Sequence, residues 1–172
     1  MPNRVLLTSF DTWKAEQSSN AADDLLAFLL GQGAIPKHFC LVRRLVVDTL
    51  LATEVILAQV DRFKPTVVMC CGMSSQREQL ALEKTAYSDD RHQALHTAID
   101  LETLCRDLSM TTISHDAGTF VCNATYFNLL AYLKEQTSAT KGLFLHVPLL
   151  TEQNQSLITQ ACSVLLQRLM AL

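Results

Sequence analysis

Short apolar runs alternate with longer amphipathic segments along the chain, and this alternation limits the folds that the chain can adopt. The runs at residues 66–71 (TVVMCC) and 142–147 (GLFLHV) are rich in apolar and β-branched residues, which is typical of strands buried on both faces. In residues 49–63 apolar side chains recur at helical spacing, and Lys64 and Pro65 end the pattern. Strands that alternate with helices predict an α/β fold, with three layers (α/β/α) around a central, mostly parallel (mixed) sheet.

The same patterns predict the remaining elements. A helix capped by Ser19 or Asn20 should end near Gly31 or Gly33. No repeat, linker or change of composition interrupts the pattern, so residues 1–172 are predicted to form a single domain, long enough to bury a core. The other expected strands are residues 4–8, 39–47, 80–87 and 111–114, and the other expected helices are residues 98–108, 123–135 and 153–172.

Composition and charge exclude several classes of protein. Hydrophobic residues make up 49% of the chain and charged residues 18%, which indicates a globular protein. The net charge of −3, without a long basic run, argues against binding to nucleic acid or to an anionic membrane. The first residues lack the apolar core of a signal peptide, and no apolar run is long enough to cross a bilayer.

The metal-ligating residue types do not form a recognisable site. The six cysteines contain no CxxC pair, so we expect neither a disulfide framework nor a structural zinc site. We expect a reducing, cytoplasmic location instead. His92 and His96 are four residues apart and would share the face of a helix, but no third ligand accompanies them. We therefore expect no metal centre.

Cys122 stands where the chain is predicted to change from a turn to a helix, directly after GTFV at residues 118–121. The free N–H groups and the dipole at the start of a helix favour a thiolate, and they can also bind an oxyanion. Gly118 permits a tight turn before the cysteine. Cys122 is therefore a candidate nucleophile, with a small core cysteine as the alternative reading.

Two other side chains are hard to explain by packing. His146 ends a predicted buried strand, and Glu83 lies in the mainly apolar segment LALEKTA. His146 could act as a general base whose tautomer Glu83 fixes. A structural histidine and an exposed Glu83–Lys84 charge pair are the alternatives. In sheets of this kind ligands bind at the carboxyl ends of strands, so the loops that begin near residues 8, 72, 117 and 146 are candidates for one site.

Four segments resemble, in order, the pyroglutamyl peptidase I family (the pyrrolidone-carboxylate peptidases). VLLTSFDTW (5–13) is similar to the opening strand and its loop, and LALEKTAYSDD (80–90) to the glutamate signature. DAGTFVCNATYFNLL (116–130) is similar to the cysteine signature, and GLFLHVPLLTEQ (142–153) to the histidine segment. The resemblance implies a single α/β domain, often tetrameric, that hydrolyses the amide after an N-terminal pyroglutamyl residue without a cofactor.

The resemblance also implies a role for each site residue. Cys122 would be the nucleophile, His146 the general base and later acid, and Glu83 the carboxylate that orients the imidazole. A small, uncharged lactam ring can be buried by aromatic walls, whereas a charged amino terminus would lose its hydration there. The implied substrate-binding residues are Phe10, Trp13, Met73, Phe120 and Val121.

Three segments depart from the family pattern. They are the loop at residues 8–15, the turn at residues 72–75, and the segment at residues 89–111, which is shorter than in the family. The changes surround the three reactive residues and leave those residues in place. Two alternatives to a pyroglutamyl peptidase therefore stay open. One is a cysteine hydrolase for a different blocked N-terminus or small amide, and the other is a non-catalytic binding or structural subunit. The expected partners are a small peptide with a blocked N-terminus and, as a homo-oligomer, further copies of the chain, but no nucleic acid and no membrane.

Overall fold

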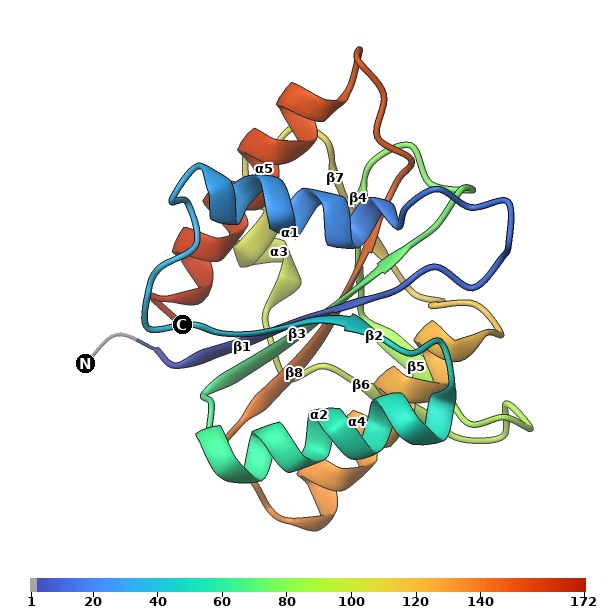
Figure 1. Cartoon of the computed structure of the whole chain (residues 1–172). Coiled ribbons are helices and arrows are strands. Elements are labelled where there is room, and N and C mark those ends of the chain that lie inside the picture. The colour runs from blue at the N-terminus through green and yellow to red at the C-terminus, as the bar shows by residue number, and fades with distance from the viewer. Residues whose placement is uncertain (1–2) are drawn as a thin grey trace.

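The computed structural model describes residues 3–172 and is built around a six-stranded sheet (Figure 1). Its strands are β1 (Val5–Phe10), β2 (Cys40–Leu45), β3 (Val67–Met73), β4 (Leu80–Glu83), β7 (Thr111–Ser114) and β8 (Lys141–Val147). Their order in the sheet is β2-β1-β3-β8-β4-β7. β2, β1, β3 and β8 are parallel, whereas β4 pairs antiparallel with β8 and parallel with β7. The sheet is therefore mixed and mostly parallel.

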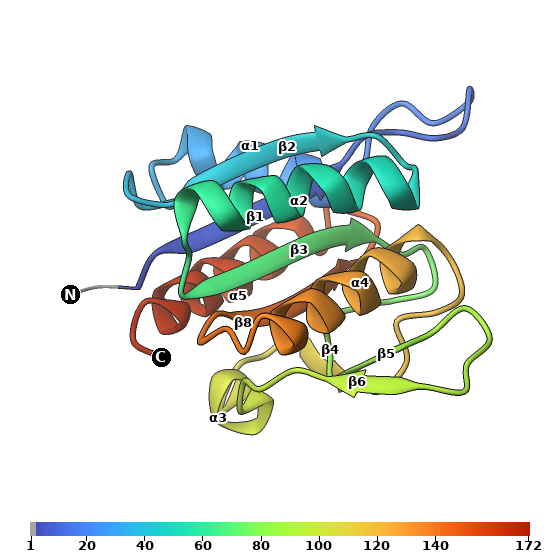
Figure 2. The same cartoon turned by 90° about the horizontal axis from the view of Figure 1, so that it is seen from below.

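Helices cover both faces of this sheet (Figures 1 and 2). One face carries α1 (Ala21–Gly31), α3 (Leu101–Cys105) and α5 (Gln155–Leu169), and the other carries α2 (Thr49–Phe63) and α4 (Val121–Glu135). Side chains of the strands alternate between two buried apolar clusters, so that Leu7 joins the α1 side and Leu6 the α2 side. The predicted three-layer α/β/α fold is confirmed.

Local capping explains where the helices begin. The side chain of Asn20 accepts a hydrogen bond from the backbone N–H of Ala22, and that of Asp48 accepts one from Leu51. The predicted bounds of α2 are correct at both ends, and the helix stops at Lys64, whose φ of 49° is left-handed. No helix of the described residues is both long and apolar enough to span a membrane.

Residues 80–87 differ from the prediction of one continuous strand. They form β4 and a separate strand, β5 (Thr85–Tyr87), which pairs antiparallel with β6 (Ala94–His96). This hairpin packs against α4 (Figure 2). His96 therefore lies on a strand, with its Nδ1 3.0 Å from Thr85 Oγ1, and the helix face that His92 and His96 were expected to share does not exist. The helix predicted at residues 98–108 is shorter in the structure: α3 begins after Asp100, whose side chain accepts a hydrogen bond from the N–H of Thr103, and ends at Cys105.

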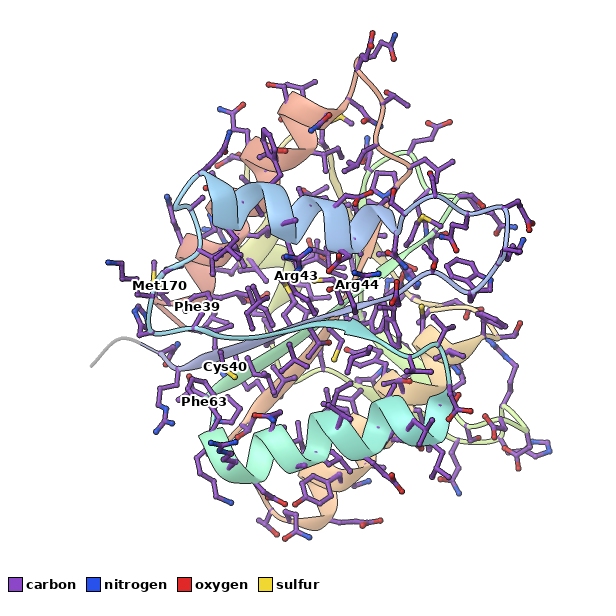
Figure 3. The ribbon with its side chains drawn as sticks, in the orientation of Figure 1. Phe39, Cys40, Arg43, Arg44, Phe63 and Met170 are labelled. Atoms are coloured by element: carbon purple, nitrogen blue, oxygen red, sulfur yellow. The ribbon has the colours of Figure 1, made fainter. Side chains whose placement is uncertain are left out.

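The edge strand β2 carries a bulge at its carboxyl end. Its register with β1 shifts there, and Arg44 takes a φ of 60°. As a result Arg43 and Arg44 both lie on the α1 side of the strand, whereas Cys40 lies on the α2 side near Phe63 (Figure 3). The bulge thus directs two guanidinium groups toward α1 and the loop that precedes it.

Asp23 of α1 receives one of these groups. Arg43 donates from Nε to Asp23 Oδ1 and from Nη2 to Oδ2, both at 2.8 Å, and Ser9 Oγ donates to Oδ1 at 2.6 Å. Burial by itself would raise the pKa of Asp23, but the hydrogen bonds from Arg43 and Ser9 outweigh it and hold the pKa below its ordinary value of 3.8. The network fixes the end of β1 to α1, on either side of the loop at residues 11–20.

Asp23→Asn should lower the free energy of unfolding at pH 7 by about 2 kcal/mol, because it leaves Arg43 without its bidentate partner. A depressed pKa stabilises the fold above the pKa of the unfolded chain, and this stabilisation is lost as the pH falls through the lower folded-state value. The difference between the variant and the wild type should therefore shrink below pH 3.8. Denaturant unfolding at neutral and acidic pH measures it. Asp24→Asn is the control, since within residues 3–172 the Asp24 carboxylate accepts a hydrogen bond only from the exposed Ser19 Oγ. A difference independent of pH would contradict this account.

Candidate active site

A pocket of about 540 Å³ lies at the carboxyl ends of β1, β3 and β8. Helix α4 begins at its wall, and the loop after β1 forms its rim. Glu83 is fully buried behind this pocket rather than in its lining. The other predicted site residues all line it, namely Phe10, Trp13, Met73, Phe120, Val121, Cys122 and His146.

Cys122 is the second residue of α4, which begins at Val121, two residues before the predicted start. Gly118 makes the preceding turn with a φ of +87°, and its N–H donates to Asp116 Oδ1 at 2.9 Å. Phe120 is extended, and no side chain within the described residues caps the helix start. The first backbone N–H groups of α4 are therefore free to bind an anion beside the sulfur.

The Cys122 sulfur lies against the backbone of β3. A Cβ atom built at Gly72 would lie 2.7 Å from Cys122 Sγ and 2.8 Å from Phe144 Cζ. Gly72 is also the register partner of His146 across β3 and β8. The sulfur and the imidazole thus occupy neighbouring positions on one face of the sheet, and only glycine leaves room for them.

His146 and Glu83 form a buried pair. His146 Nδ1 lies 2.7 Å from Glu83 Oε1, and the side chains are 7% and 0% exposed. Because β4 runs antiparallel to β8, Glu83 faces Phe144 and reaches His146 diagonally from deeper in the sheet. The alternative of an exposed pair with Lys84 is wrong, since Lys84 is exposed and Glu83 is not.

Two charged residues that line the pocket, Arg77 and Asp116, are not among the predicted site residues. Arg77, in the loop between β3 and β4, lies with Nη2 3.2 Å from Glu83 Oε1 and 2.8 Å from Ser114 Oγ. A carboxylate in an apolar segment signals that a cation must lie nearby, because an unpaired buried charge is costly. The sequence does not show which of the basic residues supplies it.

The expectation of a thiolate at the start of α4 is not met. Burial raises the pKa of the Cys122 thiol to about 12, with further increases from Cys70 and the Glu83 carboxylate. The N–H group of Cys122 itself lowers the pKa, but by less. Cys122 therefore keeps its proton at neutral pH, and a base must remove that proton as the sulfur attacks.

The walls of the pocket are largely aromatic. The rings of Trp13 and Phe120 lie 6.1 Å apart at 49° and form an exposed rim, while Phe10 is buried below them. Met73 Sδ accepts a hydrogen bond from the N–H of Ala21 at 3.4 Å. Its sulfur is thus turned toward α1 and offers no N–H donor to a ligand.

Comparison with known sequences finds pyrrolidone-carboxylate peptidases among the relatives of this chain. A family model described as "Pyroglutamyl peptidase" matches residues 90–171, a stretch that includes Cys122 and His146 but not Glu83. The pyrrolidone-carboxylate peptidases of Brevibacillus brevis and Erwinia tasmaniensis are 25% and 27% identical, each over 87% of this chain and 80% of their own. The match to that of Brachyspira hyodysenteriae is 28% identical but spans only 58% of this chain and 62% of the relative, less than two thirds of its length.

Solved structures give the same match along nearly the whole chain. Pyroglutamyl peptidase I of Bacillus amyloliquefaciens superimposes with a TM-score of 0.82 at 20% identity, covering 99% of this chain and 98% of its own. The pyrrolidone carboxyl peptidase of Thermococcus litoralis gives 0.79 at 20% identity, covering 98% and 93%. These likenesses establish a common fold.

Proposed function

We propose that the chain is a member of the pyroglutamyl peptidase family and that it is a cysteine omega-peptidase, which hydrolyses the amide bond after an N-terminal pyroglutamyl residue. The observation that carries the proposal is the 2.7 Å contact between His146 Nδ1 and Glu83 Oε1, at the back of the pocket that Cys122 and His146 both line. This contact leaves Nε2 as the imidazole nitrogen available to the thiol.

In the proposed reaction His146 removes the proton of Cys122 while the sulfur attacks the carbonyl carbon of the pyroglutamyl residue. Glu83 accepts a hydrogen bond from Nδ1–H and stabilises the imidazolium that forms. The free N–H groups at the start of α4 bind the oxyanion of the tetrahedral intermediate. A base is required at this step because burial keeps the resting thiol protonated.

The intermediate then collapses as the C–N bond breaks, and the imidazolium gives its proton to the leaving amine. A thioester between pyroglutamate and Cys122 remains. Water attacks this thioester with His146 as the base, releasing pyroglutamate and restoring the thiol. All atoms come from the peptide and water, so the proposed reaction requires no cofactor or metal.

The pocket supports a small, uncharged group at the N-terminal side of the bond. Phe10, Trp13 and Phe120 provide aromatic surface for a lactam ring. Arg77 and Asp116 also line the pocket, but each is already paired, with Glu83 and Arg91 respectively, so neither is a free counter-ion for a charged amino terminus. A blocked N-terminus avoids the loss of hydration that an ammonium group would suffer there.

The proposal predicts cleavage of a fluorogenic pyroglutamyl amide with a kcat/KM at least ~100-fold above that for the prolyl and glutaminyl amides of the same fluorophore. The prolyl compound keeps the ring but has a charged amine in place of the lactam, and the glutaminyl compound opens the ring. Fluorescence release measures all three. Equal rates for the three amides would contradict the proposed specificity.

The second candidate, a cysteine hydrolase for another blocked amide, is favoured by Met73. Its thioether offers no N–H to a lactam carbonyl, and it lies in the turn at residues 72–75 that departs from the family pattern. Acetylated and formylated amino-acid amides in the same assay separate the two candidates. Cleavage of one of these with none of the pyroglutamyl compound would favour the second.

Location and assembly are part of the same proposal. All six cysteines are free, which fits a reducing cytoplasm. We also propose a homo-oligomer, because four large apolar side chains at the start of α2 and just before it are exposed, namely Val46, Leu50, Leu51 and Val55. Light scattering in solution measures the assembly.

A further inference from the structure

We propose that Arg77 is a positioning residue for the reaction: it keeps the Glu83 carboxylate charged and fixes it relative to the segment that leads to Cys122. This inference rests on the proposed function, because it assigns a role to Arg77 within the same site. Arg77 would act on the imidazole through Glu83, without bonding to the substrate.

The contacts of Arg77 join three parts of the chain at one nitrogen. Its Nη2 lies 3.2 Å from Glu83 Oε1 at the end of β4 and 2.8 Å from Ser114 Oγ at the end of β7. It also lies 3.0 Å from the carbonyl oxygen of Asp116, in the segment before α4. The guanidinium therefore connects the carboxylate behind the imidazole to the backbone that leads into the nucleophile's helix.

The burial of Glu83 explains why a cation is required there. Its side chain is fully buried, and Oε2 has no hydrogen-bond partner within residues 3–172. Among the described residues, two partners lie within ion-pair distance of Glu83, namely Arg77 and His146. Only Arg77 is charged whether or not the imidazole is protonated, so it alone balances the carboxylate when His146 is neutral.

Removal of the guanidinium would leave a buried anion facing a neutral imidazole. Such a carboxylate takes up a proton or moves toward water, because an unpaired buried charge is strongly unfavourable. In either case Glu83 would no longer hold Nδ1–H of His146 in the orientation that the reaction needs. Arg77 lines the pocket as well, but its Nη2 is engaged by Glu83, Ser114 and Asp116. The aromatic walls proposed to bind the lactam ring come from other residues, so substrate binding should change little.

The chain offers a matched control in Arg91. This residue holds the same segment, with Nη2 2.8 Å from Asp116 Oδ2 and Nη1 3.3 Å from the carbonyl oxygen of Gly118, and its guanidinium lies over Tyr87. It forms no ion pair with Glu83. Arg91→Gln therefore tests the effect of loosening the segment alone.

The experiment compares kcat and KM of Arg77→Gln, Arg77→Lys and Arg91→Gln for the pyroglutamyl amide. We expect kcat of Arg77→Gln to fall on the order of 10²-fold while KM stays within ~3-fold, because the lost interaction matters in the transition state. Arg77→Lys, which keeps the charge but not the planar fork, should regain about tenfold of that loss. Arg91→Gln should change kcat by less than ~5-fold.

A double-mutant cycle with Glu83→Gln separates the proposed role from a structural one. In the Glu83→Gln background, Arg77→Gln should lower kcat by less than ~3-fold, because the carboxylate through which Arg77 acts is already gone. An equal loss in both backgrounds, or a raised KM with kcat intact, would overturn the inference.

Thermal unfolding of every variant checks that it is folded. If Arg77→Gln alone does not fold, Arg77→Lys and the double variant provide the same comparison. A wild-type protein without activity on any amide would refute the proposed function as well. An active wild type with an unaffected Arg77→Gln would refute only the role of Arg77.

Discussion

Cys122→Ala is expected to lower kcat for the pyroglutamyl amide by on the order of 10⁴-fold or more, because the variant has no atom that can form the thioester. The residual rate would come only from the oxyanion-binding N–H groups and from substrate binding. The alanine should fit without strain, since it only removes a sulfur that packs against Gly72. KM should therefore change little.

Cys105→Ala is the control for this measurement. Cys105 is another half-buried free cysteine, but it lies on α3, away from the pocket lining. Cys105→Ala should keep full activity. Its melting temperature should lie within a few degrees of that of Cys122→Ala. Equal rates of wild type and Cys122→Ala would exclude thiol catalysis and favour the reading as a non-catalytic relative.

Gly72→Ala should lower kcat/KM by on the order of 10³-fold and the free energy of unfolding by about 2 kcal/mol. The added Cβ would lie 2.7 Å from Cys122 Sγ and 2.8 Å from Phe144 Cζ, closer than atoms can pack. Phe144 is fully buried and has no space to retreat into. The sulfur must therefore move away from its place beside His146.

Gly31→Ala provides the matched control for this overpacking. A Cβ at Gly31, the last residue of α1, meets nothing within 4 Å. The variant should keep its activity and its stability, or gain a few tenths of a kcal/mol from a less flexible unfolded chain. Enzyme kinetics and denaturant unfolding measure both variants, and wild-type kinetics in Gly72→Ala would show that the sulfur has room to shift.

The layers of the fold could be predicted because they depend on local patterns. The apolar periodicity and the Lys-Pro stop give α2 its correct bounds, and the predicted strand at residues 111–114 is β7. Helix ends were less accurate where tertiary contacts decide them. Val121 begins α4 because Gly118 and the extended Phe120 turn the chain just before it.

The direction of β4 was missed, although the sequence contains a clue to it. Residues 74–79, which join β3 to β4, are too few for the crossover that parallel strands require. The short connection turns β4 antiparallel to β8, its neighbour in the sheet, and this places Glu83 beneath His146 rather than at the rim of the site.

Within the site, sequence reasoning named residues that the structure places around one pocket, but it did not find Arg77. Charged residues in polar loops look alike in a sequence, and only the fold shows that this one reaches a buried carboxylate. The protonation state of Cys122 could not be predicted from the sequence either. The start of a helix lowers the pKa of a thiol, but burial raises the pKa of Cys122 by more, and the extent of burial depends on the packing of β3 and β8.

Because Cys122 retains its proton in the absence of substrate, the resting protein should resist inactivation by oxidants. Peroxides oxidise thiolates to sulfenic and then sulfinic acids, and they react slowly with neutral thiols. With a pKa of about 12, the sulfur is almost entirely in the unreactive form in a neutral cell. An idle molecule would thus tolerate hydrogen peroxide that inactivates enzymes with a permanently ionised cysteine, and it would become vulnerable only during turnover.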